Sequence, residues 1–185
     1  MGEQHKKHNR REHLNDFHLN VAGEYVYDGA LYACQNDDAK QRRSKRAVWG
    51  MAAILTVAVA AGGCIPAPGM QNCFYVLLPY LGEFLGAASV IWALAKLGTD
   101  WGTVREYNYK KSVAVLPVRT AVTAVFSLLG IVCELIFFFV NDHAGQTFFA
   151  LLYVLLKLIA LLSVLVLRAE IMQAEWDKLP KKNNS

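Results

Sequence analysis

The chain has 185 residues, of which 55% are hydrophobic and 18% charged, and its formal net charge is +4. A soluble domain usually has about 45–50% apolar and about 25% charged residues, whereas the apolar residues here are concentrated between positions 47 and 167. This distribution excludes a soluble single-core enzyme, a disordered protein and a compact nucleic-acid-binding domain. It predicts an integral membrane protein without a nucleic-acid partner.

Residues 1–46 are polar and basic, and we expect them to form a partly disordered cytoplasmic segment. Within this segment, residues 17–32 are rich in aromatic side chains and fit two structures. Phe17, Val21 and Tyr25 have the spacing of one helical face. Alternatively, residues 17–21 and 25–27 show the two-residue alternation of side chains that is typical of short strands. We expect this stretch to dock on the membrane domain, to lie among lipid headgroups or to bind a partner. The histidines of the segment lack the spacing of metal ligands, and no metal site is predicted.

Four stretches are long and apolar enough to cross a bilayer, because about 30 Å of hydrocarbon requires about 20 residues at about 1.5 Å per residue. They are residues 47–65, 73–95, 113–140 and 147–167. The short linkers between them allow only antiparallel neighbours. The sequence therefore predicts an all-α, integral membrane four-helix bundle with up-down-up-down topology over residues 47–167, followed by a tail at residues 168–185.

The basic residues predict the orientation of this bundle. All but two of the 19 Lys and Arg residues lie in the N-terminal segment, the linker between the second and third spans, or the C-terminal tail. Basic residues next to spans stay on the cytoplasmic side. We therefore expect both termini to be cytoplasmic, with the chain in the plasma membrane. The same linker carries Trp101, Tyr107 and Tyr109, which are typical of an aromatic belt at the membrane surface.

Cys64 and Cys73 lie at the predicted outer ends of the first two spans, on either side of a short turn. Both would face an oxidising compartment, where a disulfide between them would clip the outer hairpin. Two free thiols are the alternative. The spacing of the two residues is not that of a catalytic dithiol.

Charged residues inside the spans carry the most functional information, because a charge near the bilayer centre costs about 2.5–3.5 kcal/mol on insertion scales. Counting along the helices places Glu83 and Lys157 about 15 Å from the outer edge and Glu134 about 9 Å from it. These three side chains are close enough in depth to form one cluster. Arg119 lies near the inner end of the third span, where its long side chain can reach the headgroups as an anchor.

The cluster has three interpretations. Glu83 and Lys157 form a structural ion pair, with Glu134 hydrogen-bonded or protonated. Alternatively, Glu83 and Glu134 form a proton or cation site that Lys157 biases. In the third interpretation, the charges contact a partner subunit.

Gly82 and Gly86 form a GxxxG motif in the second span. Small residues four apart let two helices approach closely. We expect the motif to pack either within the bundle or against another subunit.

The chain has no phosphate-binding loop, nucleophile–base pair or metalloprotease motif, so neither an enzyme nor a cofactor is predicted. The leading hypothesis is an accessory or scaffold subunit of a membrane assembly, whose partners are the lipid bilayer and other membrane subunits or copies of itself. The alternative is a small oligomeric proton- or cation-coupled transporter or channel that uses the Glu/Lys cluster.

Overall fold

Four long helices form the body of the computed structural model, which describes residues 17–19, 23, 25–27, 29–98, 101–141 and 147–179. They are α2 (Asp38–Cys64), α4 (Phe74–Leu97), α6 (Leu116–Val140) and α7 (Thr147–Met172). Each is long and apolar enough to cross a membrane. The predicted all-α class and the four helices are thereby confirmed.

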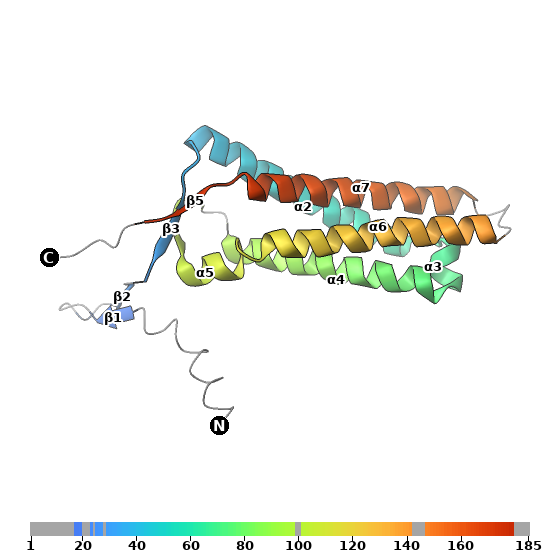
Figure 1. The fold of residues 1–185 in the computed structure, drawn as a ribbon, viewed down its shortest axis with the longest axis horizontal. Coiled ribbons are helices and arrows are strands. Elements are labelled where there is room, and N and C mark those ends of the chain that lie inside the picture. The colour runs from blue at the N-terminus through green and yellow to red at the C-terminus, as the bar shows by residue number, and fades with distance from the viewer. Residues whose placement is uncertain are drawn as a thin grey trace, which may run out of the picture.

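The long helices run antiparallel to their neighbours in sequence and lie side by side (Figure 1). α7 packs between α2 and α6, and α4 packs mainly on α6 and less extensively on α2. The short helix α3 (Pro68–Asn72) joins α2 to α4 at one end of the bundle, which we call the α3 end. The opposite end, which we call the sheet end, carries a small β-sheet and the helix α5 (Glu106–Lys111).

Two of the helices are longer than the predicted spans. α2 begins at Asp38 rather than near residue 47, and α7 continues to Met172 rather than ending near residue 167. Hydropathy detects only the apolar part of a helix, whereas Lys, Arg, Gln and Glu also favour helix formation. The two extensions contact each other, since Ser44 Oγ donates a hydrogen bond of 2.8 Å to Glu170 Oε2.

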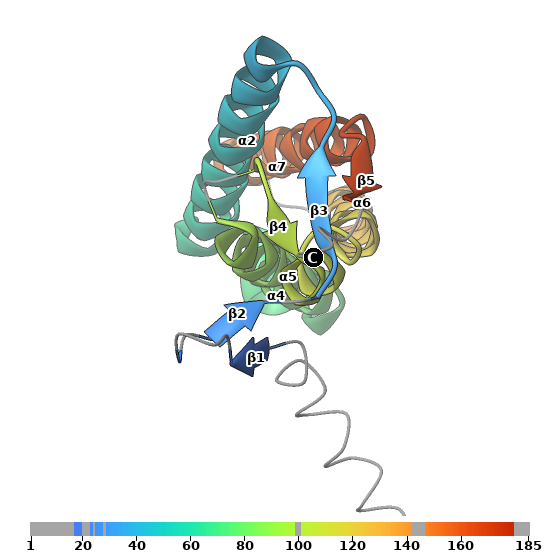
Figure 2. The ribbon, with the colours of Figure 1, turned by 90° about the vertical axis from the view of Figure 1, so that its left-hand side faces the viewer.

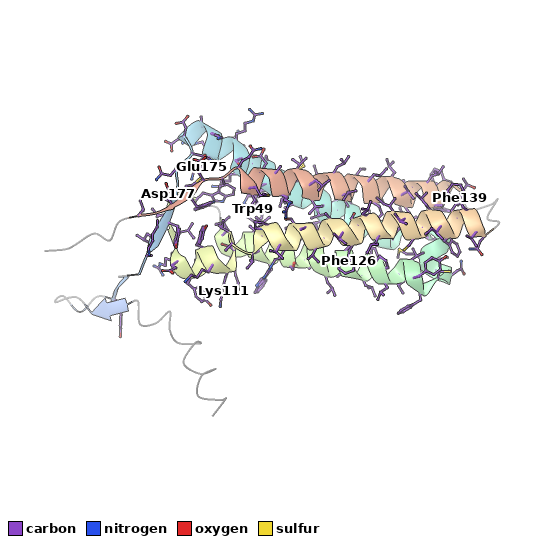
Figure 3. The ribbon with its side chains drawn as sticks, viewed as in Figure 1. Trp49, Lys111, Phe126, Phe139, Glu175 and Asp177 are labelled. Carbon is purple, nitrogen blue, oxygen red and sulfur yellow. The ribbon has the colours of Figure 1, made fainter. Side chains whose placement is uncertain are left out.

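The bundle is apolar on its outside and partly polar on its inside. Large apolar side chains are exposed on all four helices, among them Val57, Leu85, Val118 and Leu151. The labelled Phe126 and Phe139 belong to the bundle, whereas Lys111, Glu175 and Asp177 lie at the sheet end (Figure 3). The buried polar side chains include Glu83, Glu134, Lys157, Thr120, Thr123 and Ser127. This pattern is the reverse of that of a soluble four-helix bundle, in which apolar faces turn inward.

A three-stranded antiparallel sheet covers the sheet end (Figure 2). Its strands come from three separate parts of the chain: β3 (Leu31–Cys34), β4 (Val104–Arg105) and β5 (Trp176–Lys178). β3 is central, with Tyr32 opposite both Val104 of β4 and Lys178 of β5. The sequence did not predict this sheet, because strands of two to four residues are too short to show an alternating pattern.

Aromatic side chains pack beneath this sheet. The rings of Tyr32 and Tyr109 are stacked with their centroids 4.1 Å apart. The ring centroid of Trp176 lies 6.0 Å from that of Tyr109 and 6.1 Å from that of Trp101. Trp101 is only 4% exposed. The interfacial belt expected from the sequence is therefore wrong for Trp101, which belongs to the core, while Tyr107 is exposed.

A separate hairpin precedes the sheet. β1 (Phe17–Leu19) pairs antiparallel with β2 (Tyr25–Tyr27), with Phe17 opposite Tyr27. Gly23, between the two strands, has a φ of +80°, a conformation that glycine adopts without strain. Of the two structures expected for residues 17–32, the strands are the one observed. The rest of the predicted N-terminal segment before residue 17 and the end of the C-terminal tail from residue 180 lie outside the described residues.

Candidate functional site

An ion pair lies in the interior of the bundle. Lys157 of α7 donates a hydrogen bond from Nζ to Glu83 Oε2 of α4, and the side chains are 3% and 0% exposed. α4 and α7 both run from the α3 end to the sheet end, and the equal depths of the two residues are those expected from the sequence. The structure thus brings together two of the three residues of the predicted cluster.

Uncharged side chains complete the surroundings of Lys157. The ammonium group lies 4.6 Å from the ring centroid of Tyr80 and 5.1 Å from that of Tyr153. A cation over an aromatic face is attracted by the ring quadrupole, more strongly where water is excluded. On α6, Gly130 faces the lysine stem, and a Cβ at this position would lie 3.6 Å from Lys157 Cε. Lys157 is therefore held by one carboxylate and two aromatic rings.

Glu134 is placed differently. Its side chain is fully buried and hydrogen-bonds with the backbone of α3: the N–H of Gly69 donates to Glu134 Oε1 at 3.4 Å. A Cβ added to Gly69 would overlap Glu134 Oε2, so glycine is required for this approach. The structure thus joins Glu134 to the turn at the α3 end, and no ion pair links it to Lys157 among the described residues.

Two tyrosines that sequence analysis did not single out belong to this site. The hydroxyl of Tyr80 donates to the Val59 carbonyl at 3.3 Å, and it lies against Gly63, where a Cβ would overlap it. Tyr153 is fully buried. A signal was present in the sequence, because Tyr80 is three residues from Glu83 and Tyr153 is four from Lys157. Residues at these separations lie on the same helix face.

Three buried oxygen atoms at the site have no hydrogen-bond partner among the described residues: Glu83 Oε1, Glu134 Oε2 and the Tyr153 hydroxyl. Buried polar groups in proteins are nearly always hydrogen-bonded, and exceptions require an explanation. We call Glu83, Glu134, Tyr153 and Lys157 the buried polar cluster.

Arginine side chains tie the helices together nearer the sheet end. Arg119 Nη1 of α6 donates to the Ser89 carbonyl of α4 at 2.6 Å, and Arg168 Nη1 of α7 donates to the Pro117 carbonyl of α6. Arg119 is half-buried. Its role as a headgroup anchor stays a prediction, because Arg119 hydrogen-bonds to a neighbouring helix.

The GxxxG motif packs within the bundle. A Cβ on Gly82 would lie 2.5 Å from the ring of Phe126, and one on Gly86 would lie 2.5 Å from Thr123 Oγ1. Both neighbours belong to α6. The two glycines therefore allow close contact between α4 and α6, which is the intramolecular alternative considered from the sequence.

Cys64 and Cys73 are free cysteines in the structure, as are Cys34 and Cys133. Cys64 is exposed and Cys73 is partly buried. The disulfide between them is not formed here and stays a prediction for chemical labelling.

The first turns of α2 form an open basic groove. It is lined by Asp38, Ala39, Arg42, Arg43 and Arg46. Basic side chains immediately before an apolar run are placed where anionic lipid headgroups lie.

No known protein family, curated protein or solved structure matches this chain.

Proposed function

We propose that this chain is a four-pass integral membrane protein of the plasma membrane that acts as a non-enzymatic accessory or scaffold subunit of a larger membrane assembly. The sheet end faces the cytoplasm in this proposal, so both termini are cytoplasmic. Its partners are the lipid bilayer and other membrane subunits or further copies of the chain.

The distribution of polar and apolar side chains supports membrane insertion. Side chains such as Val57, Leu85 and Val118 are each about two-thirds exposed on the bundle surface. In water, such a surface would aggregate, because soluble monomers rarely expose apolar patches larger than a few hundred Å². In a bilayer, the same surface contacts lipid chains.

The orientation is supported by the basic residues. Those of α2, α5 and the segment after α7 lie at the sheet end, whereas the turn from residue 65 to residue 73 at the α3 end contains no Lys or Arg. Basic residues remain on the cytoplasmic side of a membrane.

The observation that carries the scaffold function is the use of the charged side chains inside the spans. Glu83 and Lys157 pair with each other, Glu134 accepts from Gly69, and Arg119 donates to Ser89. Each contact joins two helices of the same chain. A buried pair of this kind is best explained as fixing the register of the helices.

The sheet end supplies a surface for a partner. Three cytoplasmic segments combine there into one ordered sheet, in which β4 and β5 are edge strands. Edge strands are the positions at which a strand of another chain can join a sheet. An accessory subunit would use such a surface to contact the cytoplasmic part of its assembly.

Purification from native membranes in mild detergent tests the scaffold function. We expect a stoichiometric partner, which the double variant Glu83→Gln/Lys157→Met retains because it leaves no unpaired charge inside the bundle. A chain that purifies without any partner contradicts the proposal.

Native cysteines test the orientation. After reduction, a membrane-impermeant thiol reagent applied to intact cells should label Cys64, which is exposed at the α3 end, but not Cys34 at the sheet end. Single-cysteine variants and permeabilised cells provide the controls. Labelling of Cys34 from outside would reverse the proposed orientation.

A proton- or cation-coupled transporter or channel is the second candidate, and the three unpaired oxygens of the buried polar cluster favour it. The two functions differ in the behaviour of Glu83→Gln. In a transporter this variant folds but transports nothing, whereas in a scaffold it loses stability and Lys157→Met restores it.

A further inference from the structure

The buried polar cluster contains more oxygen atoms than its protein contacts satisfy. Glu83, Glu134 and Tyr153 are each fully buried, and each has one oxygen without a partner among the described residues. The Tyr153 hydroxyl lies within electrostatic range of both carboxyl groups. Tyr153 and Glu134 also lie at similar depths, because each is about two turns from the α3 end of its helix.

The charges of the cluster do not balance. Lys157 neutralises Glu83 by direct contact. The Glu134 carboxyl group receives one backbone N–H on Oε1, which supplies no positive charge. An isolated carboxylate in apolar surroundings is so costly that such a group neutralises instead.

The other titratable groups near Glu134 do not supply the missing charge. Tyr75 of α4 interacts electrostatically with Glu134, with Cys133 of α6 and with Cys73 at the start of α4. Each of these groups is neutral or negative at any pH. The cation among the described residues of the cluster is Lys157, which Glu83 already holds.

We infer that Glu134 binds a proton on Oε2 and shares it with the hydroxyl group of Tyr153 through one ordered water molecule, because the two oxygens do not hydrogen-bond to each other directly. Binding converts the carboxylate to a neutral carboxylic acid, whose O–H donates while Oε1 continues to accept from Gly69. The bound proton thus removes the charge of Glu134 and makes Oε2 a hydrogen-bond donor.

A proton fits this site better than a metal cation. Hard cations such as Ca²⁺ and Mg²⁺ take about six or more oxygen ligands, whereas the cluster offers three oxygens beside the Lys157 ammonium group. The inference does not depend on the scaffold function, because a protonated Glu134 is compatible with either proposed function.

Infrared spectroscopy of the full-length chain in lipid vesicles tests the inference. At neutral pH we expect the carbonyl band of a protonated carboxylic acid, which shifts in D₂O and is lost in Glu134→Gln. Tyr153→Phe should keep the band but shift its frequency, because the hydrogen-bond partner is removed. Tyr80→Phe is the matched control: it keeps the ring, removes a partly buried hydroxyl that donates to Val59, and should leave the band unchanged.

Three results would overturn the inference. The first is the absence of a protonated carboxyl band at neutral pH in the unmodified chain. The second is a band that persists in Glu134→Gln and disappears in Glu83→Gln, which would place the proton on Glu83. The third is an unshifted band in Tyr153→Phe. This last comparison leaves both carboxyl groups in place, so it remains decisive if Glu134→Gln does not fold.

Discussion

The interior of the bundle and its sheet end are stabilised by opposite kinds of contact. In the interior, charged and polar groups are buried and paired, as Glu83 is with Lys157. At the sheet end, aromatic rings are buried, and the ion pair between Glu106 and Lys110, with its N–O distance of 2.6 Å, is exposed. The contrast is the one expected of the proposed membrane protein, in which buried polar groups add specificity where lipid provides no hydrophobic drive between helices.

The largest effect should come from breaking the buried ion pair. Glu83→Gln or Lys157→Met alone leaves a buried charge without a partner, which costs about 3–5 kcal/mol in soluble proteins. Each single variant should therefore lower the unfolding temperature in detergent. The double variant should recover much of the loss, because neither charge remains.

The exposed pair at the sheet end provides the control for this cycle. Glu106→Gln/Lys110→Met changes the same residue types on α5, where surface pairs contribute about 0–1 kcal/mol. If the losses in unfolding free energy caused by Glu83→Gln and by Lys157→Met simply add in the double variant, the two side chains do not pair directly.

A smaller and local effect is expected at the sheet end. Trp101 is 4% exposed and packs near Trp176. Truncating a buried Trp costs about 3–5 kcal/mol where the whole fold depends on it, but here we expect the loss to be confined to the sheet end, where Trp101 packs with the ends of α4 and α7. In Trp101→Ala, amide exchange should rise over β3, β5 and these helix ends while the rest of α4 and α7 remains protected.

The comparison variant for Trp101 is Tyr107→Ala, which removes an exposed aromatic side chain from α5. It should leave exchange in the sheet unchanged. If amide exchange in Trp101→Ala rises by the same amount in the helices and in the sheet, the two regions unfold as one unit.

The sequence predicted the helices and the depth of the ion pair, but not the partners of every charge. Long apolar runs identify spans, and the rise per residue fixes how deep Glu83 and Lys157 lie. Depth does not determine which direction a side chain faces around the helix axis. The structure thus joins Glu134 to Gly69 of α3, although its depth also suited contact with Lys157.

The sheet was hidden from the sequence for a different reason. β3, β4 and β5 are short and pair across residues far apart in the chain. Their pairing depends on the bundle, which brings the ends of α4 and α7 close to the start of α2. Strands of this kind form because of tertiary structure, and local patterns do not predict them.

The smallest of these effects should arise at the turn of the α3 end. In Gly69→Ala, the new methyl group overlaps Glu134 Oε2, and overpacking of this kind costs about 1–3 kcal/mol. We expect a lower unfolding temperature and faster amide exchange in α3.

Gly50→Ala in α2 is the matched control, because no atom lies within 4 Å of a Cβ there and alanine favours helix over glycine by about 1 kcal/mol. If Glu134 is what makes Gly69 necessary, Glu134→Ala should relieve the loss caused by Gly69→Ala, because the space that the methyl group needs is then empty. A Gly69→Ala variant as stable as the unmodified chain would show that α3 moves away from α6 at little cost, and that the α3 end is held less firmly than the sheet end.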